Sequence, residues 1–271
     1  MIEVFHRPAS LREALALKRK ARAAAYLAGG TYVNSGDFEF APSTVIALEG
    51  LGLDRVETRA GTIVLGACVT LQQLIDDRRV PAGLRADASQ VVPRNVRNAA
   101  TIGGHLAAGL PQSDLVPMLA ALEATVAISG SAAARSAGAA QYAARPAAGL
   151  VTRVEIPRPA ASRRFACRNL RESANARSVV SVAVSFGLER GIVRAPVLAI
   201  SGLGRATVRI AAVERWLDGK PLPDLDTIQQ RVCAAVRPAE SPVASVALRR
   251  HEAGSLVALG LHEAAAKGGR S

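Results

Sequence analysis

The chain of 271 residues has few of the residues that mark metal-binding and disulfide-stabilised proteins. It holds only three cysteines, Cys68, Cys167 and Cys233, and no Cys-x-x-Cys pair. This pattern cannot by itself hold an ordinary iron–sulfur cluster or a four-cysteine zinc site. The four histidines show no metal-ligand spacing. A sparse, odd number of cysteines suits a reducing cytosol.

Several signatures of other protein classes are also absent. No stretch approaches the roughly 20 apolar residues that a membrane-spanning helix needs, and the first residues lack the basic-then-apolar pattern of a secretory signal. We therefore expect a cytoplasmic protein that does not associate with a membrane. The sequence has no Gly-x-Gly-x-x-Gly, Walker or Gly-x-Ser-x-Gly motif, which disfavours a Rossmann nucleotide site, an ordinary NTPase and an α/β-hydrolase.

Aromatic residues make up only 3% of the chain, whereas hydrophobic residues make up 49%. The core must therefore consist mainly of Ala, Val, Leu and Ile. Thirty-four basic and 22 acidic residues give a net charge of +12, so nucleic-acid binding has to be considered. The arginines are scattered, however, and no basic run exceeds Lys18-Arg19-Lys20. Attraction to an anionic cofactor or to an acidic partner explains the charge equally well.

The pattern of elements predicts an α+β protein of two domains. A cluster of prolines and small residues at 157–162 is the best boundary, which gives an N-terminal domain at 1–158 and a C-terminal domain at 163–267. Helices are expected at 11–24, 71–75, 83–92, 115–123, 207–217, 226–236 and 245–266, and strands at 26–28, 44–48, 62–69, 125–128 and 150–156. A hairpin is expected from 179–188 and 192–203, and the segment 129–148 predicts nothing definite.

The first of two glycine pairs, Gly29-Gly30, directly follows a predicted strand and precedes Thr31. Free backbone N–H groups in such a turn can bind phosphate oxygens, and the threonine adds a hydroxyl. Taken alone, the pair is more often a plain tight turn.

The second pair, Gly103-Gly104, lies within a segment that has no reason to be glycine-rich if it is only a strand or a helix. Glycine inside such elements costs about 0.5–1 kcal/mol each, and a close backbone approach to a ligand would explain that cost. Asp114 follows, either as an acceptor for ribose or ribityl hydroxyls or, with Ser113, as the cap of the next helix. The two pairs together suggest a large ligand held from two sides.

The segments in combination resemble the FAD-binding (medium) subunit of the molybdenum hydroxylases, the family of xanthine dehydrogenase and carbon monoxide dehydrogenase. The matching pieces are Arg7-Pro8-Ala9-Ser10-Leu11, Leu27-Ala28-Gly29-Gly30-Thr31, Ile63 to Thr70, Arg97-Asn98 with Thr101-Ile102-Gly103-Gly104, Pro111 with Asp114, and Glu155-Ile156-Pro157. The resemblance covers nearly the whole chain. The combination of Ala-Gly-Gly-Thr with Arg-Asn-x-x-Thr-Ile-Gly-Gly is specific to it.

The resemblance implies a two-part FAD-binding domain of the vanillyl-alcohol-oxidase type, with parts at about 1–50 and 51–158, and a smaller α+β C-terminal flavoprotein domain. It also implies molybdopterin on a large partner subunit, 2Fe–2S clusters on a small one, and electron transfer through FAD to NAD⁺ or another acceptor. The FAD contacts that it implies are Leu27, Ala28, Gly29, Gly30, Thr31, Tyr32, Val33, Asn34, Thr101, Ile102, Gly103, Gly104, His105, Asp114, Val151 and Arg168.

The chain departs from the family's pattern at two places. Most relatives follow Gly-Gly-Thr with Asp-Leu and a longer loop, whereas this chain has Tyr32-Val33-Asn34 and a short stretch, as in a xanthine-dehydrogenase-type branch with a short loop. His105 replaces a common Asn. These departures motivate an alternative hypothesis, a cofactor-free relative that acts as a scaffold. A third hypothesis, motivated by the charge, is a nucleic-acid-binding protein.

Overall fold

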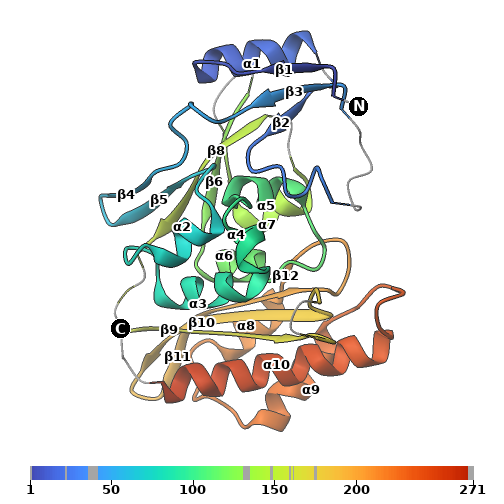
Figure 1. Ribbon diagram of the computed structural model, residues 1–271. Helices are drawn as coiled ribbons and strands as arrows, with labels where there is room; N and C mark the ends of the chain where they lie inside the picture. Colours follow the sequence, from blue (N-terminus) through green and yellow to red (C-terminus); the bar gives the residue numbers. More distant parts are fainter. Residues whose placement is uncertain are drawn as a thin grey trace.

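The computed structural model describes residues 2–21, 23–35, 42–130, 135–146, 149–158, 160, 162–173 and 176–267. Three sheets follow one another along the long direction of the molecule (Figure 1). A small N-terminal sheet lies at one end, a larger sheet with short helices lies in the middle, and a sheet covered by long helices lies at the other end.

The N-terminal sheet consists of three parallel strands in the order β1 (Val4–His6), β3 (Thr44–Ala47) and β2 (Ala25–Leu27). Helix α1 (Leu11–Lys20) covers it and begins at Ser10, whose hydroxyl accepts the N–H of Glu13 at 3.2 Å. The Glu13 carboxylate accepts the N–H of Ala9, the residue before this cap. The helix ends four residues before the predicted position 24.

The middle sheet is antiparallel, with the strand order β4-β5-β8-β6-β7. Its strands are β4 (Val56–Arg59), β5 (Thr62–Gly66), β6 (Thr125–Ser129), β7 (Arg135–Gly138) and β8 (Leu150–Pro157). The helices of this part are α2 (Leu71–Asp76), α3 (Ala82–Val91), α4 (Arg94–Arg97), α5 (Ile102–Ala108), α6 (Leu115–Ala121) and α7 (Ala139–Ala144). Thr70 caps α2 through a complete capping box with Gln73.

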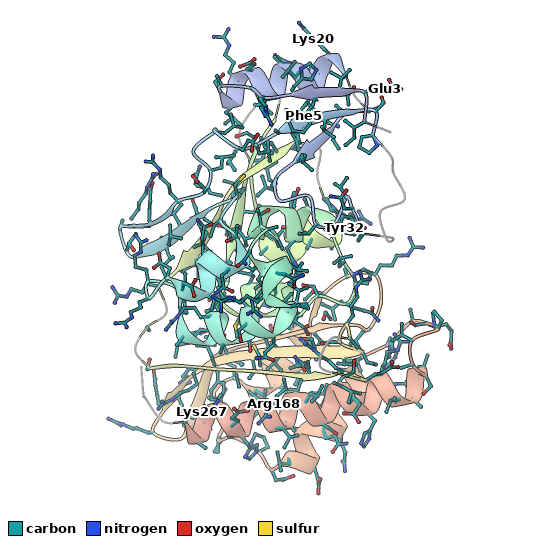
Figure 2. All side chains as sticks on the ribbon, in the orientation of Figure 1. Glu3, Phe5, Lys20, Tyr32, Arg168 and Lys267 are labelled. Atoms are coloured by element: carbon teal, nitrogen blue, oxygen red, sulfur yellow. The ribbon has the colours of Figure 1, made fainter. Side chains whose placement is uncertain are left out.

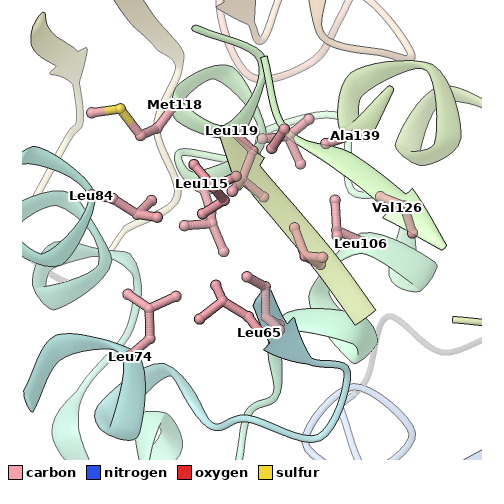
Figure 3. Packing of buried hydrophobic residues seen from close by; sticks show 14 of the residues in the cluster. Leu65, Leu74, Leu84, Leu106, Leu115, Met118, Leu119, Val126 and Ala139 are labelled. Carbon is pink, nitrogen blue, oxygen red and sulfur yellow. The ribbon is translucent and has the colours of Figure 1, made fainter. Parts of the chain in front are cut away.

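Leucines from five elements fill the core of this part, as the scarcity of aromatic residues predicted (Figure 3). They are Leu65, Leu74, Leu84, Leu106, Leu115 and Leu119, all without exposed surface. Burial of each such side chain contributes about 1.5–3 kcal/mol. The core therefore fixes α2, α3, α5 and α6 against the sheet.

The C-terminal sheet is antiparallel, in the order β12-β11-β10-β9. Its strands are β9 (Arg163–Leu170), β10 (Val180–Glu189), β11 (Ile192–Ser201) and β12 (Val208–Arg209). Helices α8 (Ala211–Leu217), α9 (Leu225–Ala235) and α10 (Val246–Ala266) complete this part, and α10 packs on β9 and β10 (Figure 1). Helix α6 packs on the opposite face of the same sheet, so the sheet lies between its own helices and those of the middle part.

The predicted fold class is confirmed, and so is the hairpin, whose turn places Arg190 and Gly191 at φ 50° and 80°. Several local predictions were wrong. The second glycine pair lies inside helix α5, the featureless segment 129–148 contains β7 and α7, and the expected helix at 207–217 begins only after β12. Strand β9 was not predicted, because it forms by pairing with β10 and its own sequence does not alternate. In the described ranges, no helix combines the length and the apolar character needed to span a bilayer.

Candidate functional site

The first glycine pair forms a tight turn after β2, and each glycine has its own reason to be there. A Cβ at Gly29 would lie 1.6 Å from the carbonyl oxygen of Ala99, so this glycine lets two backbones pack together. Gly30 has φ +68°, which a side chain would strain. The N–H groups of Gly29, Gly30 and Thr31 donate no hydrogen bond to any of the described residues. The turn therefore presents three consecutive donors.

The second pair lies in the first turn of α5, which Thr101 caps by accepting the N–H of Gly104 at 3.1 Å. A Cβ at Gly103 would lie 2.7 Å from both the Cβ and the carbonyl oxygen of Ala67, so this glycine allows the helix to approach the segment that follows β5. Gly104 is exposed, and a Cβ there would meet only the Thr101 hydroxyl, at 2.9 Å. Of the four glycines, Gly104 is therefore the exposed, helical one whose added Cβ would meet a side-chain atom and no backbone.

The N–H groups of Ile102 and Gly103 donate to Val69 and Ala67, both at 2.9 Å. Together with Gly104, the first turn of α5 thus has its donors engaged within the protein. The helix can act on an anion through the positive end of its dipole and through the Thr101 hydroxyl, but not through these N–H groups. The free donors belong to the turn that follows β2.

The two glycine segments meet at a cleft of about 330 Å³. Its lining residues come from the turn after β2, from the loop after β3, from the ends of β5 and α2, and from the segment before α5. They are Ala28, Gly29, Leu48, Glu49, Gly50, Gly52, Leu53, Asp54, Cys68, Thr70, Gln73, Asn98, Ala99 and Thr101. The loop at 48–54 was not predicted to belong to the site, although its two glycines, Gly50 and Gly52, are visible in the sequence; they take φ values of +81° and +67°.

A shallower depression of about 380 Å³ adjoins the cleft and shares Asp54 and Gln73 with it. Its other lining residues are Val56, Asp76, Asp77 and Arg79. Arg79 is paired with Asp77 at 2.5 Å, so the depression carries an excess of carboxylates. Such a surface does not favour a phosphate. In the described part of the chain, no group of His, Cys, Asp and Glu side chains could hold a metal ion.

His105 lies on α5 with its Nε2 2.7 Å from the hydroxyl of Ser113. Burial lowers the pKa of His105 to about 4, and the nearby Asp114 carboxylate opposes this only in part. The imidazole is therefore neutral at neutral pH and does not offer a positive charge to a phosphate. Ser113 also accepts the N–H of Val116 at 3.0 Å and so caps α6, while Asp114 does not take part in the cap.

Asp114 instead joins the two halves of the molecule. Its carboxylate pairs with Arg171 at 2.6 Å and accepts the hydroxyl of Ser178 at 2.5 Å. Arg171 also donates to the Ser178 hydroxyl at 3.0 Å and to the carbonyl of Gln90 at 2.5 Å. The Asp114 and Arg171 side chains are only 9% and 10% exposed. This network links α3 and α6 to the end of β9 and the start of β10.

The remaining residues implied by the resemblance do not all lie at the cleft. Ile102 and Val151 are buried in the core of the middle part. Tyr32, Val33 and Asn34 continue the turn after β2, where the Asn34 N–H donates to Gly30 at 3.1 Å. Arg168 pairs with Glu263 of α10 at 2.5 Å and lies beside that helix (Figure 2).

Comparison with protein families accounts for both parts of the chain. The model described as "FAD binding domain in molybdopterin dehydrogenase" matches residues 1–159, and the model described as "CO dehydrogenase flavoprotein C-terminal domain" matches residues 165–264. The chain belongs to this flavoprotein family. The family predicted from the two glycine segments is thus confirmed, and the chain is an FAD-binding subunit of the molybdenum hydroxylases.

Two further comparisons give a relative in sequence and two relatives in fold. Uncharacterized protein YgfM of Escherichia coli strain K12 is 35% identical over 260 residues, which are 95% of either chain. A subunit of the reconstituted CO dehydrogenase of Oligotropha carboxidovorans has a TM-score of 0.90 at 23% identity, with 98% of each chain covered. A subunit of quinoline 2-oxidoreductase of Pseudomonas putida 86 has a TM-score of 0.89 at 23% identity, also with 98% of each chain covered. These two structures, both oxidoreductases, share the fold.

Proposed function

We propose that this flavoprotein is the electron-transfer subunit of a molybdenum hydroxylase and that it passes electrons from 2Fe–2S clusters of a partner subunit to NAD⁺ or another acceptor. Bound FAD supplies the chemistry, because a flavin can take up electrons singly and release them as a hydride. The task of this chain is to bind and orient the cofactor. The three isolated cysteines agree with the assignment of the 2Fe–2S clusters to a partner subunit, since they cannot hold the clusters themselves.

The observation that carries the proposal is the turn Gly29-Gly30-Thr31. Its three consecutive N–H groups donate no hydrogen bond to the described residues, and Gly29 lines a cleft together with Thr101, the N-cap of α5. Such an arrangement suits a diphosphate, because its oxygens accept several N–H groups at once. The exposed Gly104 leaves room for the diphosphate to approach the first turn of α5.

The protein would hold the diphosphate without a positive side chain. The hydroxyls of Thr31 and Thr101 can each donate to a phosphate oxygen, and His105 is neutral. Leu27 and Ile102 then act as supports, because Ile102 is buried in the core that fixes α5. Tyr32, Val33 and Asn34 extend the same turn.

Asp114, Val151 and Arg168 remain proposed contacts of the other end of the cofactor. Each carboxylate oxygen of Asp114 can accept a second hydrogen bond beside those from Arg171 and Ser178, so a ribityl hydroxyl can still bind there. The proposed partners are a molybdopterin-binding large subunit and a 2Fe–2S small subunit, and the proposed location is the cytoplasm. The proposed domains are 1–158 and 163–267.

Flavin content tests the proposal directly. The purified full-length chain should be yellow and should release about one FAD per chain, as absorbance of the denatured supernatant would show. The Gly104→Val variant should fold and should lose the flavin, because its side chain projects into the space proposed for the diphosphate. Colourless protein that takes up no added FAD would contradict the proposal and would favour the cofactor-free scaffold.

A further inference from the structure

The single tryptophan of the chain, Trp216 on α8, carries two positive charges over its ring. The ammonium nitrogen of Lys220 lies 5.5 Å from the centre of the ring, and the guanidinium carbon of Arg231 lies 5.4 Å from it. Both distances are within the roughly 6 Å at which an aromatic face attracts a cation. Two cations from different elements, the turn after α8 and helix α9, therefore share one ring.

The end of α8 brings Lys220 back beside this ring. The helix ends at Leu217, and Gly219 follows with φ +77°, the left-handed conformation that commonly ends a helix. The Gly219 N–H donates to the carbonyl of Val193 at 2.9 Å, and the Val193 N–H donates to the carbonyl of Lys220 at 2.9 Å. Trp216 packs against the core of the C-terminal part. The ring and the turn are thus both fixed to the fold.

A third cation, Arg194 of β11, lies at the edge of the same turn. A Cβ at Gly219 would be 3.7 Å from Nη1 of Arg194. The Nε of Arg194 is 3.7 Å from the carboxylate of Glu189, which is a loose and exposed pair. The turn therefore lies among cations that come from β11, from α9 and from the turn itself.

The charges of Lys220 and Arg231 are not neutralised within the described residues. Both residues are exposed, and no described carboxylate forms an ion pair with either of them. Asp218, in the same turn, accepts the N–H of Ala195 at 2.9 Å. Like charges held close together oppose one another. An anionic group that binds between these cations would therefore be attracted by both.

The chemistry of this surface fits an acidic protein segment. In an extended segment, alternate side chains point the same way and lie about 6.6 Å apart, so two carboxylates can pair with two cations. The half-buried indole offers apolar contact to the methylene groups of those side chains. Tryptophan and arginine are also the residue types that contribute most at protein interfaces. We infer that the Trp216 surface, formed by Trp216, Lys220 and Arg231 with Arg194 at its edge, binds an acidic segment of a partner protein.

A nucleic acid fits the Trp216 surface less well. Proteins that bind single strands combine a basic groove with aromatic side chains on which successive bases stack. Here the one indole is half-buried and already covered by cations, and the other arginines of the chain are scattered. The inference is independent of the proposed function, because none of these residues is a proposed FAD contact.

Titration of the purified full-length chain with hexaglutamate tests the inference, with hexaglutamine as the neutral control peptide. Because Trp216 is the single tryptophan, its fluorescence reports binding at this surface. Hexaglutamate should change the emission saturably at low ionic strength, and added salt should weaken the binding by screening exposed charges. Hexaglutamine should have no effect.

Two double variants locate the binding. Lys220→Gln with Arg231→Gln should weaken hexaglutamate binding by about tenfold. Arg12→Gln with Arg19→Gln removes the same charge from exposed positions of α1, at the other end of the molecule (Figure 1), and should leave the affinity unchanged. Melting temperatures show whether the variants are folded. Flavin content, measured separately, should be the same in all of them.

Three results would overturn the inference. The first is a wild-type chain whose emission does not respond to hexaglutamate. The second is an equal loss of affinity, or none, in the two double variants, which would show that net charge and not this surface attracts the peptide. The third is an oligothymidylate that displaces hexaglutamate and binds more tightly, which would make the surface a nucleic-acid site.

Discussion

Replacement of Gly104 by Ala should separate stability from cofactor binding. Gly104 has a helical conformation inside α5, and alanine is favoured over glycine in a helix by about 1 kcal/mol. The added Cβ meets only the Thr101 hydroxyl, at 2.9 Å; because that hydroxyl also caps α5 by accepting the N–H of residue 104, the shift that relieves the contact offsets part of this gain. The free energy of unfolding of the deflavinated protein should therefore stay the same or rise by up to about 1 kcal/mol.

The affinity for FAD should move in the opposite direction. If the diphosphate approaches the first turn of α5, the Cβ of Gly104→Ala occupies part of its space. The expected loss is about tenfold, or about 1.4 kcal/mol. Urea unfolding of the deflavinated protein measures the stability, and quenching of flavin fluorescence measures the affinity. Unchanged FAD affinity in a folded Gly104→Ala protein would refute the close approach.

Gly103→Ala is the matched comparison on the same helix. Its Cβ would lie 2.7 Å from the Cβ and the carbonyl oxygen of Ala67, where backbone cannot move aside easily. Overpacking of this kind costs about 1–3 kcal/mol, and the helix propensity of alanine offsets about 1 kcal/mol of it. The net effect should be lower stability. Alanine at these two adjacent positions should thus change the free energy of unfolding in opposite directions.

Two further predictions concern the surroundings of α5. Arg171→Met leaves the buried Asp114 carboxylate without its cation and should destabilise the protein by about 3–5 kcal/mol in urea unfolding; a loss under 1 kcal/mol would show that the pair does not link the two halves. His105 binds a proton in the unfolded chain below pH 6.5 but not in the folded one until about pH 4, so stability falls as the pH falls through this window, by at most about 1.4 kcal/mol per unit. His105→Gln should remove that contribution, and equal slopes for the two proteins between pH 6.5 and 4 would contradict the shift.

The sequence predicted best those features that depend on neighbouring residues. The cap at Ser113 and the turn of the β10–β11 hairpin both involve contacts within a few positions, and both are present. The role of each glycine could not be predicted in this way. Gly29 packs against Ala99, 70 positions away, and such contacts exist only after folding. The same holds for Asp114, whose partners Arg171 and Ser178 lie 57 and 64 positions away.

The alternation of side chains along β9 bears on which cation of the C-terminal part can serve the cofactor. Phe165 and Cys167 pack against the core of the middle part, whereas Ala166 and Leu170 pack against the core that contains α10. Successive residues of a strand point to opposite faces. Arg168 accordingly lies on the α10 face, where it pairs with Glu263.

Arg171 follows the end of β9 and reaches across to the middle part, where it contacts Asp114 and the carbonyl of Gln90. Of Arg168 and Arg171, the geometry therefore favours Arg171 as the one that faces the middle part. Asp114 is the residue that both the resemblance and this network single out. A group that binds there acts on α6 and on the end of β9 together, so occupation of the flavin site and the fit between the two halves should stabilise each other.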